Sequence, residues 1–171
     1  PAQAAALLIV PSTVTNLWQL AAGGHLRALL RRLWPMQLMI LIGTLLGSVW
    51  LGIDSGAWAA HALGVALLVY ALYGLCHPGL HLAPRHERWL GPLCGLVTGI
   101  ITAATGVFVI PAVPYLQALG LHREQMVQAL GLSFTVSTLA LAVGLAGQGA
   151  LGGEALGASL VVLIPALLGM W

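Results

Sequence analysis

The apolar positions of the chain fall into six long runs, and short stretches between them hold nearly all the charged residues. Most runs approach the about 20 residues that a helix needs to cross the hydrocarbon core of a bilayer. Tryptophans lie near the run ends, where interfacial tryptophan is common. The pattern predicts an all-α, polytopic membrane protein with helices at residues 2–20, 36–52, 58–76, 92–118, 126–147 and 155–171.

The run within residues 93–121, LCGLVTGIITAATGVFVIPAVPYLQALGL, is apolar but contains helix breakers. Residues 107–110 are mostly β-branched and lead into Pro111, which disfavours continued helix. Ahead of them, small residues recur every three or four positions and predict a smooth face against which another helix can pack closely. These residues are Gly95, Gly99, Ala103 and Gly106.

A helix that breaks at membrane depth exposes backbone N–H and C=O groups, which are tolerated only against protein or a watery cavity. In transporters a broken helix commonly binds the substrate. We therefore expect this run to be the functional centre; the alternative is a span that is only kinked and packed. Residues 92–118 are long for one span, so the segment either re-enters or crosses.

Composition agrees with a membrane protein, because 60% of residues are hydrophobic, 6% are charged and the mean hydropathy is +0.99. A soluble domain carries roughly 25% charged residues. The six arginines, without any lysine, form no long basic face, so we expect no nucleic-acid partner. The chain begins and ends inside apolar runs, and we interpret it as a fragment of a longer multi-pass protein of the inner (plasma) membrane.

Arginines in the stretches at residues 21–35 and 77–91 place both in the cytoplasm by the positive-inside rule, and the stretch at 53–57 outside. The side of the later stretches depends on residues 92–118. If that segment re-enters, residues 119–125 are cytoplasmic and 148–154 lie outside; if it crosses, the two sides are exchanged.

The sequence also contains an internal repeat at an offset of 122 positions. Residues 13–15 (TVT) align with residues 135–137 (TVS), and residues 45–47 (LLG) align with 167–169 without a gap. Such repeats are typical of secondary transporters. We expect residues 1–52 to end a first repeat and 58–171 to form a second. The repeats are inverted if residues 92–118 re-enter and parallel if they cross.

No Asp, Glu, Lys or Arg lies in the middle of a run, which argues against a carboxylate proton relay. The expected lining is neutral. Hydroxyls, amides and helix N-termini can bind an oxyanion, although membrane Ser and Thr often bond only to their own helix. The residues expected to form this lining, from the first and fifth runs, are Ser12, Thr13, Thr15, Asn16, Gln128, Ser133, Thr135, Ser137 and Thr138.

We expect no metal site, cofactor or enzymatic activity. His77, His81 and His86 share one stretch, but prolines interrupt it and no carboxylate triad or cysteine pair completes a site. Ser133 follows a Gly-Leu pair, but no His follows it in the visible chain to act as its base.

The glycine-rich run with its proline and Gly-Leu turn, followed by the small polar stretch QALGLSFTVST at 128–138, resembles the sulfite exporter TauE/SafE family, also called the four-toluene sulfonate uptake family. The motif residues are Gly95, Gly99, Gly106, Pro111, Gly120 and Leu121. The resemblance implies transport of sulfur-containing or organic anions, often outward and driven by an ion gradient. Many members carry further glycines after the position of Gly106, where this chain has Val107 and Phe108.

We therefore expect a two-repeat transporter that exports a small sulfite-like or sulfonate-like anion by alternating access, with the lipid bilayer and a coupling ion as its other partners. A passive anion channel and a non-transporting membrane scaffold are the alternatives. The expected substrate-binding residues are Thr102, Thr105, Gly106 and Pro111, with Thr135, Ser137, Thr13 and Thr15 behind them.

Overall fold

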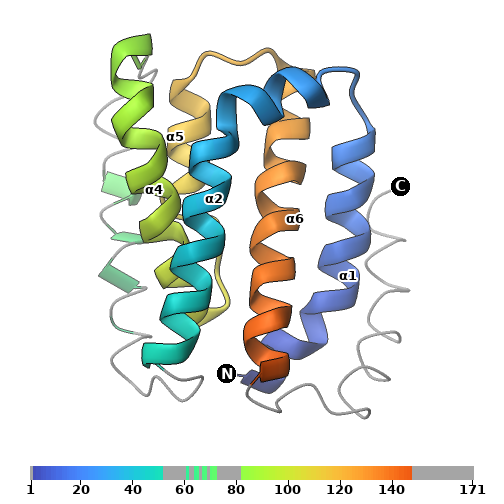
Figure 1. Cartoon of the computed structure of the whole chain (residues 1–171), viewed down its shortest axis with the longest axis vertical. Helices are drawn as coiled ribbons and strands as arrows, with labels where there is room; N and C mark the ends of the chain where they lie inside the picture. The colour runs from blue at the N-terminus through green and yellow to red at the C-terminus, as the bar shows by residue number, and fades with distance from the viewer. Residues whose placement is uncertain are drawn as a thin grey trace.

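The computed structural model describes residues 2–51, 61, 64–65, 67–68, 70–72 and 82–147, and gives side chains in this part except at 2–8, 51 and 84. Its long helices lie side by side in a bundle (Figure 1). The elements are α1 (Ala2–Ala21), α2 (Leu26–Leu51), α4 (Pro84–Thr105), α5 (Ala112–Ala118) and α6 (Arg123–Gly147). The run predicted at 155–171, and most of that at 58–76, lie outside the described residues.

Two predicted helix starts are wrong, while α1 and α6 agree closely with their runs. Helix α2 begins at Leu26, not near residue 36, because leucines alternate with the arginines at helical spacing; Leu29 and Leu33 of this stretch are buried. Helix α4 begins at Pro84, not near residue 92, and a proline is well tolerated in the first turn of a helix. The charged stretches therefore extend the helices instead of forming long loops.

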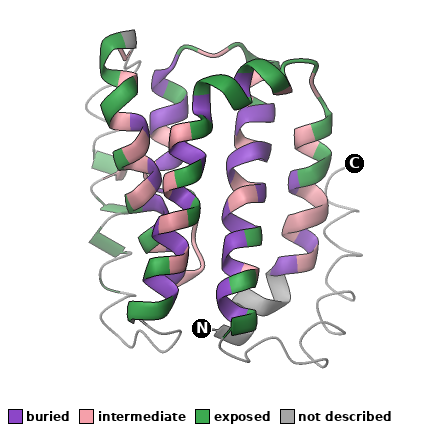
Figure 2. Cartoon of the chain, in the orientation of Figure 1, coloured by how far each residue is buried: buried purple, intermediate pink, exposed green. Residues whose placement is uncertain are grey.

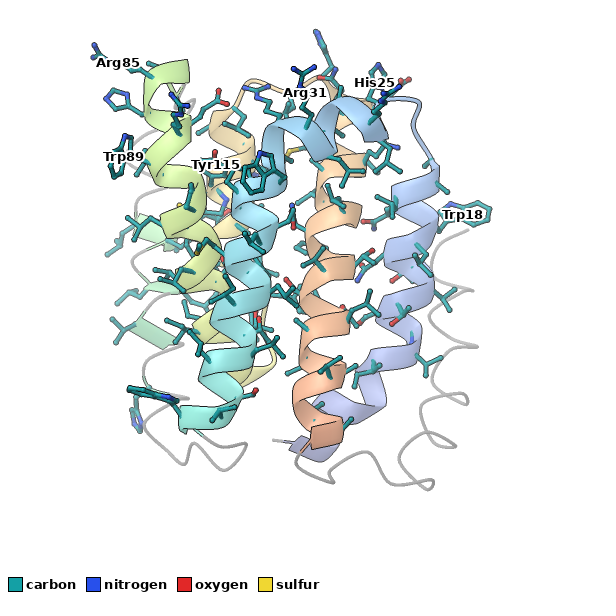
Figure 3. All side chains as sticks on the ribbon, viewed as in Figure 1. Trp18, His25, Arg31, Arg85, Trp89 and Tyr115 are labelled. Carbon is teal, nitrogen blue, oxygen red and sulfur yellow. The ribbon has the colours of Figure 1, made fainter. Side chains whose placement is uncertain are left out.

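Helices α2, α4 and α6 run in the same direction, and α1 runs in the opposite direction (Figure 1). Their directions gather the charges at one end of the bundle, which we call the arginine end; Arg31, Arg85 and His25 are labelled there in Figure 3. The arginines on the first two turns of the three helices are Arg27, Arg31, Arg32, Arg85, Arg88 and Arg123. Across this end Arg32 forms an ion pair with Glu87.

The predicted small-residue face of α4 is confirmed as its contact with α2. A Cβ at Gly99 would lie 2.6 Å from the backbone nitrogen of Thr44, and one at Gly95 would meet the carbonyl of Met36. Helix α2 matches this face, since a Cβ at Gly43 would lie 2.5 Å from the carbonyl oxygen of Leu96. The two backbones thus approach as closely as small residues allow.

Residues 92–118 turn back on themselves within the bundle, as a re-entrant segment would. Helix α4 ends at Thr105, the following residues are not helical, and α5 brings the chain back to the arginine end (Figure 1). The backbone N–H of Leu82, just before α4, donates to the carbonyl of Ala118 at the end of α5 over 2.7 Å. Arg32 also donates to the carbonyl of Leu119 over 3.4 Å. The start of α4 and the end of α5 therefore lie together.

Helices α1 and α6 pack antiparallel, and Gln128 of α6 forms hydrogen bonds to the end of α1 at the arginine end. Its side-chain amide donates to the carbonyls of Leu20 (2.8 Å) and Gly23 (2.6 Å), and its Oε1 accepts from the N–H of His25 (3.0 Å). Gln128 is itself buried. One side chain thus satisfies backbone groups at the C-terminal end of α1 and in the turn to α2, which no helix bond can satisfy.

Large apolar side chains are exposed on the outside of the bundle, and several polar side chains are buried among an apolar core; Figure 2 shows which residues are buried. Side chains exposed by more than half include Trp18, Val49, Trp50, Trp89 and Val143, whereas the buried polar residues include Asn16, Thr44, Thr98, Ser133 and Ser137. Residues Leu26–Trp50 and Arg123–Gly147 are each long and apolar enough to cross a membrane. The many large apolar side chains on the outside suit a lipid surrounding.

The close contact of α2 with α4 predicts that Gly99→Ala destabilises the protein. The added methyl group would overlap backbone atoms of α2, and overpacking costs about 1–3 kcal/mol. Thermal unfolding of the purified protein in detergent measures the effect. Gly147→Ala is the control, because nothing lies within 4 Å of a Cβ there; an equal loss of stability in both variants would contradict the close contact.

We also expect Gln128→Leu to lower the unfolding temperature. The substitution removes three hydrogen bonds and leaves backbone groups without a partner, at about 1–3 kcal/mol for each group left unsatisfied. Gln125→Leu is the matched control on the same helix, since Gln125 makes one exposed hydrogen bond, from the N–H of His122. Unchanged stability of Gln128→Leu would show that the α1 end does not depend on this side chain.

Candidate substrate site

Helix α4 ends at Thr105 with a defined glycine C-cap. Gly106 adopts φ 75°, a left-handed conformation that glycine accepts readily, and its N–H donates to the carbonyl of Thr102 over 2.8 Å. The hydroxyl of Thr105 donates to Ile101 O over 2.7 Å and accepts from the N–H of Val107 over 3.1 Å. The break therefore begins at Gly106, five residues before Pro111, which precedes α5.

The linker from α4 to α5 lies against α6. The ring of Phe108 packs on that of Phe134, with centroids 5.0 Å apart and planes tilted by 58°. The carbonyl of Val109 accepts the N–H of Val113. Within the part of the chain that the structure describes, the N–H groups of Phe108 and Val109 have no hydrogen-bond partner. Two neighbouring backbone donors are thus left for another acceptor.

A cavity of about 200 Å³ lies between this linker, α1 and α6. Its polar groups are the hydroxyls of Ser12 and Thr138 and the backbone of the linker. Thr138 Oγ1 accepts from Asn16 Nδ2 over 3.2 Å, which leaves the hydroxyl proton of Thr138 for another acceptor. The residues that line the cavity are Ile9, Ser12, Gly106, Val107, Phe108, Val109, Thr138 and Leu141.

The structure distributes the eight expected site residues unevenly. Gly106 lines the cavity, and Thr102 and Thr105 shape the helix end beside it, with Thr102 bonded to Thr98 O (2.7 Å). Pro111 begins the turn into α5 and is not among the lining residues. The hydroxyls of three others bond to carbonyls of their own helices: Thr13 to Ile9, Thr15 to Ser12 and Thr135 to Gly131. Ser137 is buried, and its hydroxyl has no partner in the described part.

Two cavity residues, Ser12 and Thr138, belong to the neutral polar set seen in the sequence but not to the expected site. Ser12 directly precedes Thr13, and Thr138 directly follows Ser137. Thr13 and Ser137 were the residues expected from the sequence to bind the substrate. Consecutive residues of a helix point in directions about 100° apart. The polar cluster in the sequence therefore indicated which part of each helix lies near the cavity, but not which of its side chains face the cavity.

The cavity carries no charged side chain of its own. The one ion pair within the described residues, between Arg32 and Glu87, lies at the arginine end. No group of three or more His, Cys, Asp or Glu residues that could hold a metal ion occurs in the same part of the chain. A ligand in the cavity would therefore meet hydroxyls, backbone donors and apolar walls.

Comparison with known families matches the whole chain. The family model described as sulfite exporter TauE/SafE covers residues 1–171. No curated protein and no solved structure gives a match. The match confirms the resemblance carried by the glycine-rich run and residues 128–138, and the apolar helices agree with a membrane location. The chain therefore belongs to the sulfite exporter TauE/SafE family, a family of membrane transporters of sulfur-containing anions.

Proposed function

We propose that this protein exports a small sulfur-containing oxyanion, sulfite-like or sulfonate-like, and that the cavity at the α4 break is its substrate site. One observation carries the proposal: Phe108 and Val109, whose N–H groups have no partner in the described part, line the same cavity as Ser12 and Thr138. Broken helices bind substrate in other transporters because their free backbone groups face a protein cavity.

The cavity volume suits a small anion. At about 200 Å³ it far exceeds the about 10–15 Å³ that one water needs, but it is below the range of roughly 300–1,000 Å³ typical of drug-sized ligands. Its donors are neutral, so they can bind an oxyanion without burying a permanent positive charge. The walls formed by Val107, Phe108 and Leu141 also offer contact to a small apolar substituent, as in an organic sulfonate.

Helix packing supports a two-repeat architecture in which residues 1–52 end one repeat and 58–171 form the other. Asn16 and Thr138, which hydrogen-bond each other, are 122 positions apart and so align in the repeat. Since α1 and α6 are antiparallel, a two-fold axis through this contact would relate the helices. Inverted repeats are the arrangement that alternating access by rocking requires around a central site.

The position of the arginines supports an orientation of the bundle in the membrane. All six arginines of the chain lie on the first two turns of α2, α4 and α6, at one end of the bundle. The positive-inside rule would place this end in the cytoplasm of a cell whose inner membrane holds the protein. With the re-entrant segment, residues 119–122 then share that side, in agreement with the Leu82 to Ala118 hydrogen bond.

The test is efflux of sulfite and a panel of small sulfonates from cells that express the full-length protein. We expect saturable efflux, weakened about tenfold or more by Thr138→Val, because a hydrogen bond to a charged group contributes about 1.5–3 kcal/mol. Ser12→Ala should weaken it in the same direction. Thr98→Val is the control, since its buried hydroxyl bonds to Cys94 O of its own helix (2.7 Å).

Each other outcome contradicts a defined part of the proposal. Equal loss of efflux in Thr98→Val and Thr138→Val, at equal expression, would show a general packing effect and remove the cavity as the site. Efflux that does not saturate and follows only the anion gradient would indicate a channel. No efflux of any panel member would contradict export of a sulfur oxyanion.

A further inference from the structure

A second cavity, of about 360 Å³, lies near the arginine end between α2 and α4. Tyr115 of α5 also lines it, and Figure 3 labels this side chain. None of its lining residues lines the cavity at the α4 break, so the two cavities are distinct. The charged residues of its wall are Arg32, Glu87 and Arg88, which the proposed substrate site does not use.

Both arginines of this wall keep N–H groups without a partner. Arg32 donates from Nε to Glu87 Oε2 over 2.9 Å and from Nη2 to the other carboxylate oxygen. Its Nη2 also donates to the carbonyl of Leu119. Within the described residues, Nη1 of Arg32 and the guanidinium of Arg88 have no hydrogen-bond partner. Because Arg32 compensates the carboxylate of Glu87, the wall offers free donors and a net positive charge.

Two exposed tryptophans indicate the depth of this cavity in the membrane. Trp34, which lines it, is 59% exposed, and Trp89 is 82% exposed. They are 55 positions apart, as are the paired residues Arg32 and Glu87. Since α2 and α4 run parallel, both tryptophans lie at one level, about 3 Å further from the arginine end than the ion pair. Tryptophan is common at the level of the lipid headgroups, so the cavity lies at that level.

The donors and the apolar part of the wall fit a phospholipid. A guanidinium group matches the geometry of phosphate oxygens and stays charged at all relevant pH values. Pro35, Met36 and Pro92 also line the cavity and offer apolar contact beside the arginines. We propose that this cavity binds the headgroup of an anionic phospholipid, with its phosphate at Arg88 and at Nη1 of Arg32. Free phosphate has the same oxyanion chemistry, but the apolar wall and the level of the tryptophans favour a lipid.

The position of the headgroup gives its binding a measurable effect on stability. Arg32 joins α2 to Glu87 near the start of α4 and to Leu119 at the end of α5. A phosphate bound at Arg32 and Arg88 would add a further link between α2 and α4. A ligand that binds only the folded protein stabilises it in proportion to its affinity. This site is independent of which anion the protein transports.

The test is the unfolding temperature of the purified full-length protein in detergent during titration with dihexanoyl phosphatidylglycerol. Dihexanoyl phosphatidylcholine, which carries a compensating positive charge, and inorganic phosphate are titrated in parallel at matched ionic strength. We expect a saturable rise with phosphatidylglycerol alone. Arg88→Gln should leave the unfolding temperature without lipid unchanged, because the guanidinium has no partner, and should shift the midpoint of the rise about tenfold or more. Arg85→Gln is the matched control, since it removes the same charge from the same helix outside the cavity wall.

Three results would overturn the headgroup site. An equal rise with phosphatidylcholine would show general solvation by lipid, and an equal rise with inorganic phosphate would show a site for a free oxyanion. An equal shift of the midpoint in Arg85→Gln and Arg88→Gln would show attraction to the arginine end as a whole instead of binding in this cavity.

Discussion

The backbone break after Thr105 is the constraint on which the rest of the bundle depends. Peptide groups that leave a helix at membrane depth must be shielded from lipid by protein or by a watery cavity. Helix α2 covers one side of α4, because glycines on both helices let the backbones meet. The linker meets α6 through Phe108 and Phe134, and α1 closes the remaining side. The cavity lies at this break, and it is lined by Phe108 and Val109, whose N–H groups have no partner in the described part of the chain.

Helix α6 connects the features of the structure. At the arginine end Gln128 holds the end of α1, and two turns further Thr135 bonds within its own helix. Beyond it, Ser137 is buried with no hydrogen-bond partner for its hydroxyl in the described part, and Thr138 lines the cavity and accepts from Asn16. These groups are neutral, so the helix can be polar on its buried faces and still suit a membrane. The described helices carry no Asp, Glu, Lys or Arg at this depth, which agrees with the proposed recognition of an ion by neutral groups.

The sequence predicted those features of the fold that depend on residues close together in the chain. The glycine spacing predicted the contact of α4, and the β-branched residues before Pro111 predicted a break, although the helix already ends at Gly106. Re-entry stayed open, because it depends on the Leu82 to Ala118 hydrogen bond between distant residues. The site was predicted less well. Hydroxyls at Thr13 and Thr135 turned out to bond to their own helices, and only tertiary packing decides which neighbour faces a cavity.

Re-entry of residues 92–118 is the central claim, and the sidedness of two engineered cysteines tests it most directly. Arg85→Cys lies at the start of α4 and His122→Cys follows α5, each made in a variant without Cys76 and Cys94. A membrane-impermeant maleimide is added to intact cells and to inside-out vesicles. The structure predicts that both cysteines react from the same side, the cytoplasmic one by the positive-inside rule. Reaction from opposite sides would show that the segment crosses the membrane, and it would contradict both the re-entrant break and the substrate cavity built on it.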